Sequence, residues 1–142
     1  MQRRAFLLAG LASAASPGPA EEMRTLVSRL AAALSEGNAS AFLKVFDRSM
    51  KDYSRLERQV TALVAQNDVT SSIEFLTDEG DDRVRRVELD WFLEIRTRQD
   101  TGVFARRRQV VKCRVERRQK GRWTIVSLEP VEFFNAPGLP PD

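Results

Sequence analysis

The chain has 142 residues, of which 42% are hydrophobic and 30% charged, and this is typical of one soluble globular domain. It contains no histidine and one cysteine, which excludes Ser-His-Asp triads, most zinc and iron sites, and a disulfide within the chain. The formal net charge of +3 includes two arginines among the first four residues, so the rest of the chain is nearly neutral.

Residues 1–20 have the layout of an export signal, in which a pair of arginines precedes an apolar run and a stretch of small residues and prolines. The run Ala5–Ala15 is shorter than the roughly 17–25 residues that span a bilayer. The segment Arg3–Leu7 resembles the twin-arginine pattern only in part, so the folded-export and general secretory routes both stay open. Ala12–Ala14 is the better candidate for the cleavage site and Gly18–Ala20 the poorer one. We expect a periplasmic or secreted protein.

Three helical segments follow the export signal. Two glutamates begin the first, where negative charge favours the amino end of a helix, and Gly37 ends it. Asn38 or Ser40 caps a short second helix, and apolar residues at helical spacing predict a third from about Tyr53 to Ala65.

From residue 69 onward the pattern predicts β-strands. The first covers about Val69–Thr77 and ends in an acidic turn, after which Arg83–Arg98 and Phe104–Arg118 alternate apolar and charged residues. The last strand begins at Trp123, ends near Leu128, and is expected to resume after a proline as Val131–Phe134. Residues 136–142, with three prolines, are expected to form a loose tail.

The inward face of the last strand stays open at this point. Trp123 and Ile125 share one face, Val126 and Leu128 share the other, and both pairs are apolar enough to face the core.

The two long strands carry charges in a pattern that predicts their register. If residues 100–102 form a three-residue hairpin loop, four pairs of opposite charge face one another on the even-numbered positions. These pairs are Glu94 with Arg108, Asp90 with Lys112, Glu88 with Arg114, and Arg86 with Glu116. On the odd-numbered face, Trp91 would meet Val111 and Leu89 would meet Cys113.

Three helices followed by four antiparallel strands predict an α+β fold, with the helices packed on a bent four-stranded sheet that forms a cone. Residues 21–135 resemble the nuclear-transport-factor-2-like superfamily, which includes ketosteroid isomerases and polyketide-cyclase-like proteins. The resemblance rests on the order of the elements, on the segment Leu34–Phe42, and on Lys120–Val126, which looks like the Gly-x-Trp-x-Ile ending of bacterial members. It implies a single domain, a pocket between the helices and the concave face of the sheet, and frequent homodimers.

An apolar pocket between helices and sheet is therefore the expected binding site, since small-molecule sites are mostly apolar cavities. Its expected lining residues are Phe42, Phe46, Tyr53, Phe75, Leu89, Trp91, Leu93 and Cys113. The alternative is that these side chains fill the core, and the sequence leaves both open.

We predict an exported, non-catalytic domain that binds a small apolar ligand or a protein partner and needs no metal or other cofactor. An isomerase or dehydratase that uses Tyr53 with Glu129 or Asp47 is the alternative, because superfamily isomerases pair a carboxylate base with hydrogen-bond donors. A third interpretation docks the face of the sheet on a protein partner or, less favourably, on an anionic membrane surface, and a homodimer is possible. Nucleic-acid binding is not expected, because basic and aromatic residues do not form a recognition strip.

Overall fold

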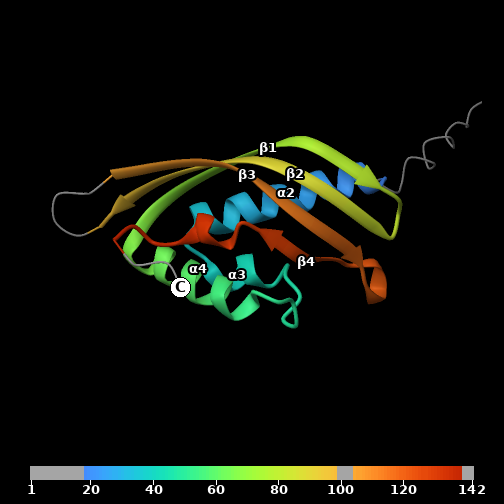
Figure 1. Cartoon of the computed structure of the whole chain (residues 1–142), viewed down its shortest axis with the longest axis horizontal. Helices are drawn as coiled ribbons and strands as arrows, with labels where there is room; N and C mark the ends of the chain where they lie inside the picture. Colours follow the sequence, from blue (N-terminus) through green and yellow to red (C-terminus); the bar gives the residue numbers. More distant parts are fainter. Residues whose placement is uncertain (1–17, 99–103, 139–142) are drawn as a thin grey trace, which may run out of the picture.

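The computed structural model of this chain describes residues 18–98 and 104–138 (Figure 1). The helices are α2 (Pro19–Ser35), α3 (Ala39–Leu43) and α4 (Tyr53–Gln66). The strands are β1 (Asn67–Gly80), β2 (Val84–Thr97), β3 (Phe104–Arg117) and β4 (Trp123–Glu129). Two short 3₁₀ helices, η2 (Gln119–Gly121) and η3 (Val131–Phe134), flank β4. The predicted α+β order of three helices and four antiparallel strands is confirmed.

Parts of the predicted organisation fall outside the described residues: the export signal up to residue 17, the hairpin loop at 100–102, and the tail from residue 139. Helix α2 begins at Pro19, so its first two residues overlap the expected signal. Ala136, where the expected tail begins, is only 3% exposed and packs in the core.

The first two helices begin and end where local chemistry dictates. Proline at the start of α2 loses no hydrogen bond there, and Glu21 and Glu22 in the first turn favour the helix dipole. Gly37 follows the helix with a φ of +70°, a conformation that glycine adopts without steric cost. The Asn38 side chain accepts a hydrogen bond of 3.0 Å from the Ala41 amide and caps α3.

The four strands form one antiparallel sheet in the order β1-β2-β3-β4. The long strands arch over α2, and α3 and α4 lie below it in the view of Figure 1. The loop after α3 covers the edge of β4, because Ile125 donates to the Val45 carbonyl and accepts from the Asp47 amide, each at 2.9 Å. Within the described part of the chain, no helix has the length and apolar character needed to cross a membrane.

The hydrophobic core lies between α2 and the concave face of the sheet. The odd-numbered apolar residues of β2 are at most 2% exposed, as the period of two predicts. These residues are Val87, Leu89, Trp91, Leu93 and Ile95. Their even-numbered neighbours face outward, and this outer face of β2 and β3 carries the charges.

The register between β2 and β3 differs from the prediction by two residues. Glu94 is opposite Arg106, Glu88 is opposite Lys112, and Asp90 is opposite Val110. The six predicted pairs are therefore wrong. They are Glu94 with Arg108, Asp90 with Lys112, Glu88 with Arg114, Arg86 with Glu116, Trp91 with Val111, and Leu89 with Cys113. A shift of two leaves each side chain on its face, so the predicted inner and outer faces are nevertheless correct.

Two features account for the shifted register. Basic residues recur at alternate positions of β3, so more than one register brings opposite charges together. Phe104 pairs with Arg96 at the end of the ladder, and the guanidinium carbons of Arg96 and Arg106 lie 5.1 and 4.9 Å from its ring centroid. These cation–π contacts stabilise the observed register at this end of the ladder.

Strand β4 resolves the open question of its inward face by means of a β-bulge. Val115 is opposite Ile125 and Arg114 is opposite Ser127, so Val126 is the extra residue. The bulge changes the parity of the strand, so Trp123 and Ile125 before it and Leu128 after it are all buried. The same change leaves Glu129 exposed.

The predicted continuation of β4 after Pro130 is wrong, because Val131–Phe134 forms the 3₁₀ helix η3. A 3₁₀ turn directs consecutive side chains around an axis instead of to opposite faces, so Val131, Phe133 and Phe134 can all be buried. Helix η3 packs against α4.

Candidate functional site

The interior of the cone brings most of the predicted binding residues together. Six of the eight are at most 5% exposed and belong to one core cluster: Phe42, Phe46, Leu89, Trp91, Leu93 and Cys113. Tyr53 and Phe75 are partly buried and pack against the edge of that cluster.

Aromatic side chains from η3 occupy the space where the pocket was expected. The Phe134 ring meets Trp91 edge-on, with centroids 5.1 Å apart and planes at 81°, and lies 5.6 Å from Phe42. Phe133 packs on the same tryptophan at 6.0 Å. The indole NH of Trp91 donates to Ser71 Oγ at 2.8 Å, so the one polar atom of this ring is satisfied. The predicted lining residues therefore pack on one another and on η3.

Phe133 and Phe134 were not predicted to belong to the site, because their alternation with Val131 and Glu132 was interpreted as a strand. The sequence did contain a signal, because Phe133 and Phe134 are adjacent aromatic residues three and four positions after Pro130. A half-buried strand would place two adjacent aromatic residues on opposite faces.

The three residues predicted as possible acid–base groups, Tyr53, Asp47 and Glu129, lie in different surroundings. Asp47 accepts hydrogen bonds from the Ser49 amide and hydroxyl at 2.8 and 2.7 Å, and Arg118 binds it at 2.9 Å. These contacts, those from Ser49 foremost, hold the pKa of Asp47 below its ordinary value, so it stays ionised and is a poor proton acceptor. Tyr53 lines a groove between α3 and α4, whereas Glu129 lines separate hollows beside β4.

The groove between α3 and α4 contains two of the predicted binding residues. It has a volume of about 610 Å³, and Phe46 and Tyr53 contribute aromatic surface to it. Lys44 and Arg48 place positive charge in it, with Glu57 as the acidic residue.

Cys113 is a structural residue of the core. It is 5% exposed, and burial raises the pKa of its thiol to about 12, so the reactive thiolate does not form near neutral pH. In residues 18–98 and 104–138, no group of three or more acidic, cysteine or histidine side chains is placed to hold a metal ion.

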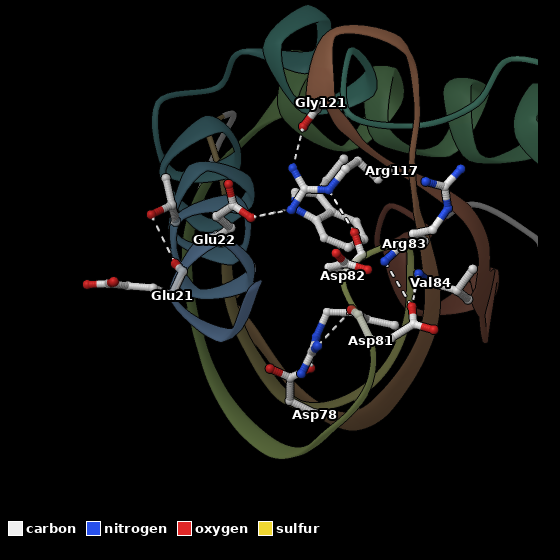
Figure 2. Close-up of polar contacts among 12 residues, drawn as sticks. Glu21, Glu22, Asp78, Asp81, Asp82, Arg83, Val84, Arg117 and Gly121 are labelled. Carbon is white, nitrogen blue, oxygen red and sulfur yellow. Dashed lines mark hydrogen bonds and ion pairs between the residues drawn. The ribbon is translucent and has the colours of Figure 1, made fainter. Parts of the chain in front are cut away.

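A polar cluster centred on Arg117 joins the start of α2 to the end of the sheet (Figure 2). Arg117 donates to Glu22 at 2.7 Å, to the Asp82 carbonyl at 2.8 Å and to the Gly121 carbonyl at 3.2 Å. Its guanidinium also lies over the Trp123 ring, 4.5 Å from the centroid. The indole NH of Trp123 donates to Glu22 at 3.0 Å and, with Arg117, lowers the pKa of that carboxyl. These contacts anchor the helix and leave Arg117 fully engaged in structure.

The middle of the outer face carries acidic side chains on β2 and basic ones on β3, while Arg86 and Arg96 place positive charge near the two ends of β2. On β2 the outward side chains include Glu88, Asp90 and Glu94, and on β3 they include four cations. Those cations are Arg106, Arg108, Lys112 and Arg114.

An ion pair marks the middle of this outer face. Arg108 binds both carboxylate oxygens of Asp90, at 3.0 and 2.7 Å, and this pairing lowers the pKa of Asp90. The two residues are diagonal neighbours across the strands, because Asp90 is opposite Val110. A hollow of about 330 Å³ lies beside the pair, with Ser72, Glu74 and Phe92 completing its lining.

Apolar side chains are also exposed on the sheet. Among the described residues, the exposed large hydrophobic side chains are Leu76, Phe104 and Val110, at 50, 42 and 41%. Phe104 and Val110 occupy outward positions of β3, and Leu76 lies at the bulge of β1. The large hydrophobic side chains that are exposed in the described part of the chain therefore lie on the sheet and not on the helices.

These features define the class: an α+β cone in which a curved antiparallel sheet closes over helices. A conserved protein from Planctomyces limnophilus has the same fold, with a TM-score of 0.68 and 11% identity over 77% of this chain and 93% of its own. A nuclear transport factor 2-like superfamily protein from Salmonella enterica matches with a TM-score of 0.62 and 11% identity, over 76% of this chain and 86% of its own.

A nuclear transport factor 2-like protein of unknown function from Shewanella oneidensis matches with a TM-score of 0.58 and 10% identity, over 78% of this chain and 96% of its own. No family model matches the chain, and no curated protein matches its sequence. The chain has the nuclear-transport-factor-2-like fold, as its resemblance to that superfamily implied, and at these identities the likeness defines the fold alone.

Proposed function

We propose that this chain is an exported, non-catalytic binding domain whose protein partner docks on the outer face of the sheet. The observation that carries the proposal is the contrast between the two faces. On the concave face Trp91 packs against Phe133 and Phe134 of η3, whereas the sheet exposes Val110, Phe104 and Leu76. These side chains are spaced along β1 and β3 among charged residues, and such apolar residues can serve as contact points for a protein partner.

The electrostatics of the acidic side chains support a binding role over catalysis. A general base needs a pKa near the working pH, whereas hydrogen bonds and ion pairs hold the pKa values of Asp47 and Asp90 below the ordinary carboxylate value. Tyr53 and Glu129, the other pair considered for catalysis, line different hollows.

Site-specific photo-crosslinking tests the docking face. A photoreactive amino acid is introduced at Val110, and the chain is expressed in the cells that produce it naturally. This variant should form a covalent adduct with a protein, because Val110 is an exposed apolar residue of this face. The same amino acid at Ser28, an exposed position of α2, is the matched control and should give none. Equal adduct yields at both positions, or no adduct at Val110, would overturn the proposed docking face.

The groove between α3 and α4 favours a second candidate, the binding of a small amphiphilic anion. Its aromatic residues Phe46 and Tyr53 could contact an apolar tail, and Lys44 and Arg48 supply positive charge. Native mass spectrometry of the purified chain tests this candidate: a reproducible added mass below 1 kDa that leaves on denaturation would support it, and a bare chain mass would refute it.

The same spectrum tests export. Cleavage after Ala14 would remove the predicted signal and leave α2, which begins at Pro19, intact. Cleavage after Ala20 would remove the first two residues of that helix. We therefore propose the earlier site, and a chain that retains residues 1–14 after expression in an exporting host would contradict the proposal.

A further inference from the structure

We infer that the free edge of β3 between Phe104 and Val110 binds an extended peptide, which adds a strand to the sheet and carries an acidic residue opposite Arg107. This inference rests on the proposed docking face, to which Val110 belongs, and names the chemistry of the partner. It follows from the unpaired backbone of β3, from the exposed side chains along it and from the charge of Arg107.

Strand β3 is twice as long as the strand beside it. It has 14 residues and β4 has 7, and the pairing of the two begins at Lys112, which is opposite Glu129. Beyond Glu129 the chain leaves the sheet, and η3 packs on α4 (Figure 1). Within the described ranges, residues 104–110 of β3 therefore have a neighbouring strand only on the β2 side.

The unpaired length of β3 presents a row of backbone hydrogen-bonding groups. In an antiparallel sheet, alternate residues of a strand bond to the neighbour on one side and then to the neighbour on the other. The Arg117 amide donates to the Arg83 carbonyl at 2.8 Å, so the odd-numbered residues of β3 bond to β2 and the even-numbered ones point away from it. No backbone group of the described residues bonds to four of these even-numbered residues. They are Phe104, Arg106, Arg108 and Val110.

Such a row is a template for another strand, because a peptide laid along it completes the main-chain ladder. The sheet is antiparallel throughout, and antiparallel pairs are slightly the more stable per residue. We therefore expect the added strand to run antiparallel to β3, in the direction of β4.

Exposed apolar side chains mark both ends of this length. Phe104 is 42% exposed and Val110 is 41% exposed, and both point to the outer face of the sheet. A seven-residue strand along the edge would place its first and last side chains beside them. Apolar pairs across neighbouring strands stabilise the pairing and fix its register.

The middle of the length is basic. Arg106 and Arg108 point to the outer face and bind Glu94 and Asp90 of β2, at 3.6 and 2.7 Å. Their charges are therefore partly neutralised within the sheet. The selectivity of the edge for charge depends mainly on the arginine between them.

Arg107 is a half-buried cation without a carboxylate partner among the residues that the structure describes. It is opposite the buried Leu93, so it points to the concave side, where its guanidinium donates to the Phe133 carbonyl at 2.8 Å. Burial lowers the pKa of Arg107, but a guanidinium stays charged in proteins. A carboxylate on the added strand, opposite Arg107 and on the same face, would supply the missing counter-charge.

The spacing of these three contacts predicts the sequence of the peptide. Positions 104, 107 and 110 are three residues apart, and residues three apart in a strand point to opposite faces. The outer two peptide side chains therefore lie on the outer face, and the middle one lies on the concave side with Arg107. The expected pattern is an apolar residue, any two residues, an acidic residue, any two residues and a second apolar residue.

A second copy of this chain does not fit the same edge. Antiparallel pairing of two β3 edges about Arg107 would place this residue opposite its own copy, and Arg106 opposite the other copy's Arg108. Like charges directly opposite one another destabilise a pair of strands. The edge therefore favours an acidic segment of a different protein.

A synthetic peptide tests the inference. The probe is Val-Thr-Thr-Glu-Thr-Thr-Val with blocked ends and a fluorescent label, and its binding to the purified full chain is measured by fluorescence anisotropy. Valine and threonine favour the extended conformation. We expect saturable binding, and replacement of the central glutamate by lysine should raise the dissociation constant about 10-fold or more.

Two N-methylated probes separate strand addition from attraction between charges. In the antiparallel arrangement the amides of the third and fifth probe residues point at β3, whereas those of the second and sixth point to solvent. Methylation of the third and fifth amides should abolish binding, because it removes two ladder donors and places methyl groups against the edge. Methylation of the second and sixth amides is the matched control and should change the dissociation constant little.

A charge reversal in the protein tests the role of Arg107. Arg107→Glu should reverse the preference, so that the lysine probe binds more tightly than the glutamate probe, and this reversal also shows that the variant is folded. Arg24→Glu, at an exposed position of α2, makes the same change in net charge and should keep the preference for glutamate.

The absence of saturable binding, equal binding of the two methylated probes, or an unchanged preference in Arg107→Glu would overturn strand addition at this edge. The proposed docking face fails separately. If Val110 gives a protein adduct in cells but the probe does not bind, the docking face stands and strand addition falls. If the probe binds as expected but Val110 gives no adduct, strand addition stands and the docking of a cellular protein falls.

Discussion

Truncation of Phe134 to alanine tests whether η3 closes the interior of the cone. The side chain is fully buried and makes edge-on contacts with both Trp91 and Phe133. Removal of the ring forfeits about 2–3 kcal/mol of transfer free energy. The two aromatic contacts contribute about 0.5–1.5 kcal/mol each. We therefore expect the free energy of unfolding to fall by about 4 kcal/mol, within the range of about 3–5 kcal/mol for a buried phenylalanine.

Urea denaturation followed by tryptophan fluorescence measures this change, with all variants at one protein concentration. Phe104→Ala is the matched control, because it removes the same ring from a site that is 42% exposed. With its two exposed cation–π contacts, the loss should be about 1–2 kcal/mol, less than half of that for Phe134. The Phe134→Ala variant should also gain stability in the presence of indole or benzene, which fit the vacated space. Equal destabilisation by the two variants would show that Phe134 does not close the interior.

Three further predictions concern the sheet and its anchor. A double-mutant cycle should show stabilising coupling between Asp90 and Arg108 and none between Asp90 and Lys112, and the reverse result would restore the register predicted from sequence. Arg117→Ala should lower the free energy of unfolding by about 2 kcal/mol, measured by the same urea denaturation. Arg117→Lys should recover little of that loss, because a lysine cannot bind Glu22 and both carbonyl groups together. Full recovery of stability in the lysine variant would contradict this prediction. The pKa of the Cys113 thiol is raised to about 12 in the folded chain, whereas in the unfolded chain it is near 9.0. The free energy of unfolding should therefore fall as the pH rises between these two values. Thermal melts across pH 9–11 should show a smaller fall for Cys113→Ala, and parallel curves would refute this origin.

The alternation of apolar and charged residues predicted the faces of the sheet but not its register. A side-chain period of two identifies which residues share a face, and a shift by two residues preserves that information completely. The register depends instead on the hairpin loop and on contacts such as Phe104 between Arg96 and Arg106. The regular basic residues of β3 gave opposite-charge pairs in the wrong register as well as in the correct one.

The candidate site was harder to predict than the fold, because its closure depends on irregular elements. The bulge at Val126 reverses which residues of β4 face the core, so both faces of this strand carry apolar residues. A strict alternation with a period of two residues cannot describe such a strand. The aromatic residues at 133–134 were predicted to lie in a strand, although they belong to the 3₁₀ helix η3, whose rings pack against Trp91. Lining residues such as Trp91 and Leu93 were placed correctly on the concave face, but no local pattern specifies that a later segment packs on them.

The position of η3 near the end of the folded body has a consequence for the order in which the protein is made. Trp91 is synthesised some forty residues before Phe133 and Phe134, the rings that cover it. Until those residues have left the ribosome, the nascent sheet has an uncovered aromatic surface on its concave side. The complete native core can therefore form only after residues 133–134 have been translated, and until then this aromatic surface is open to contact by a chaperone.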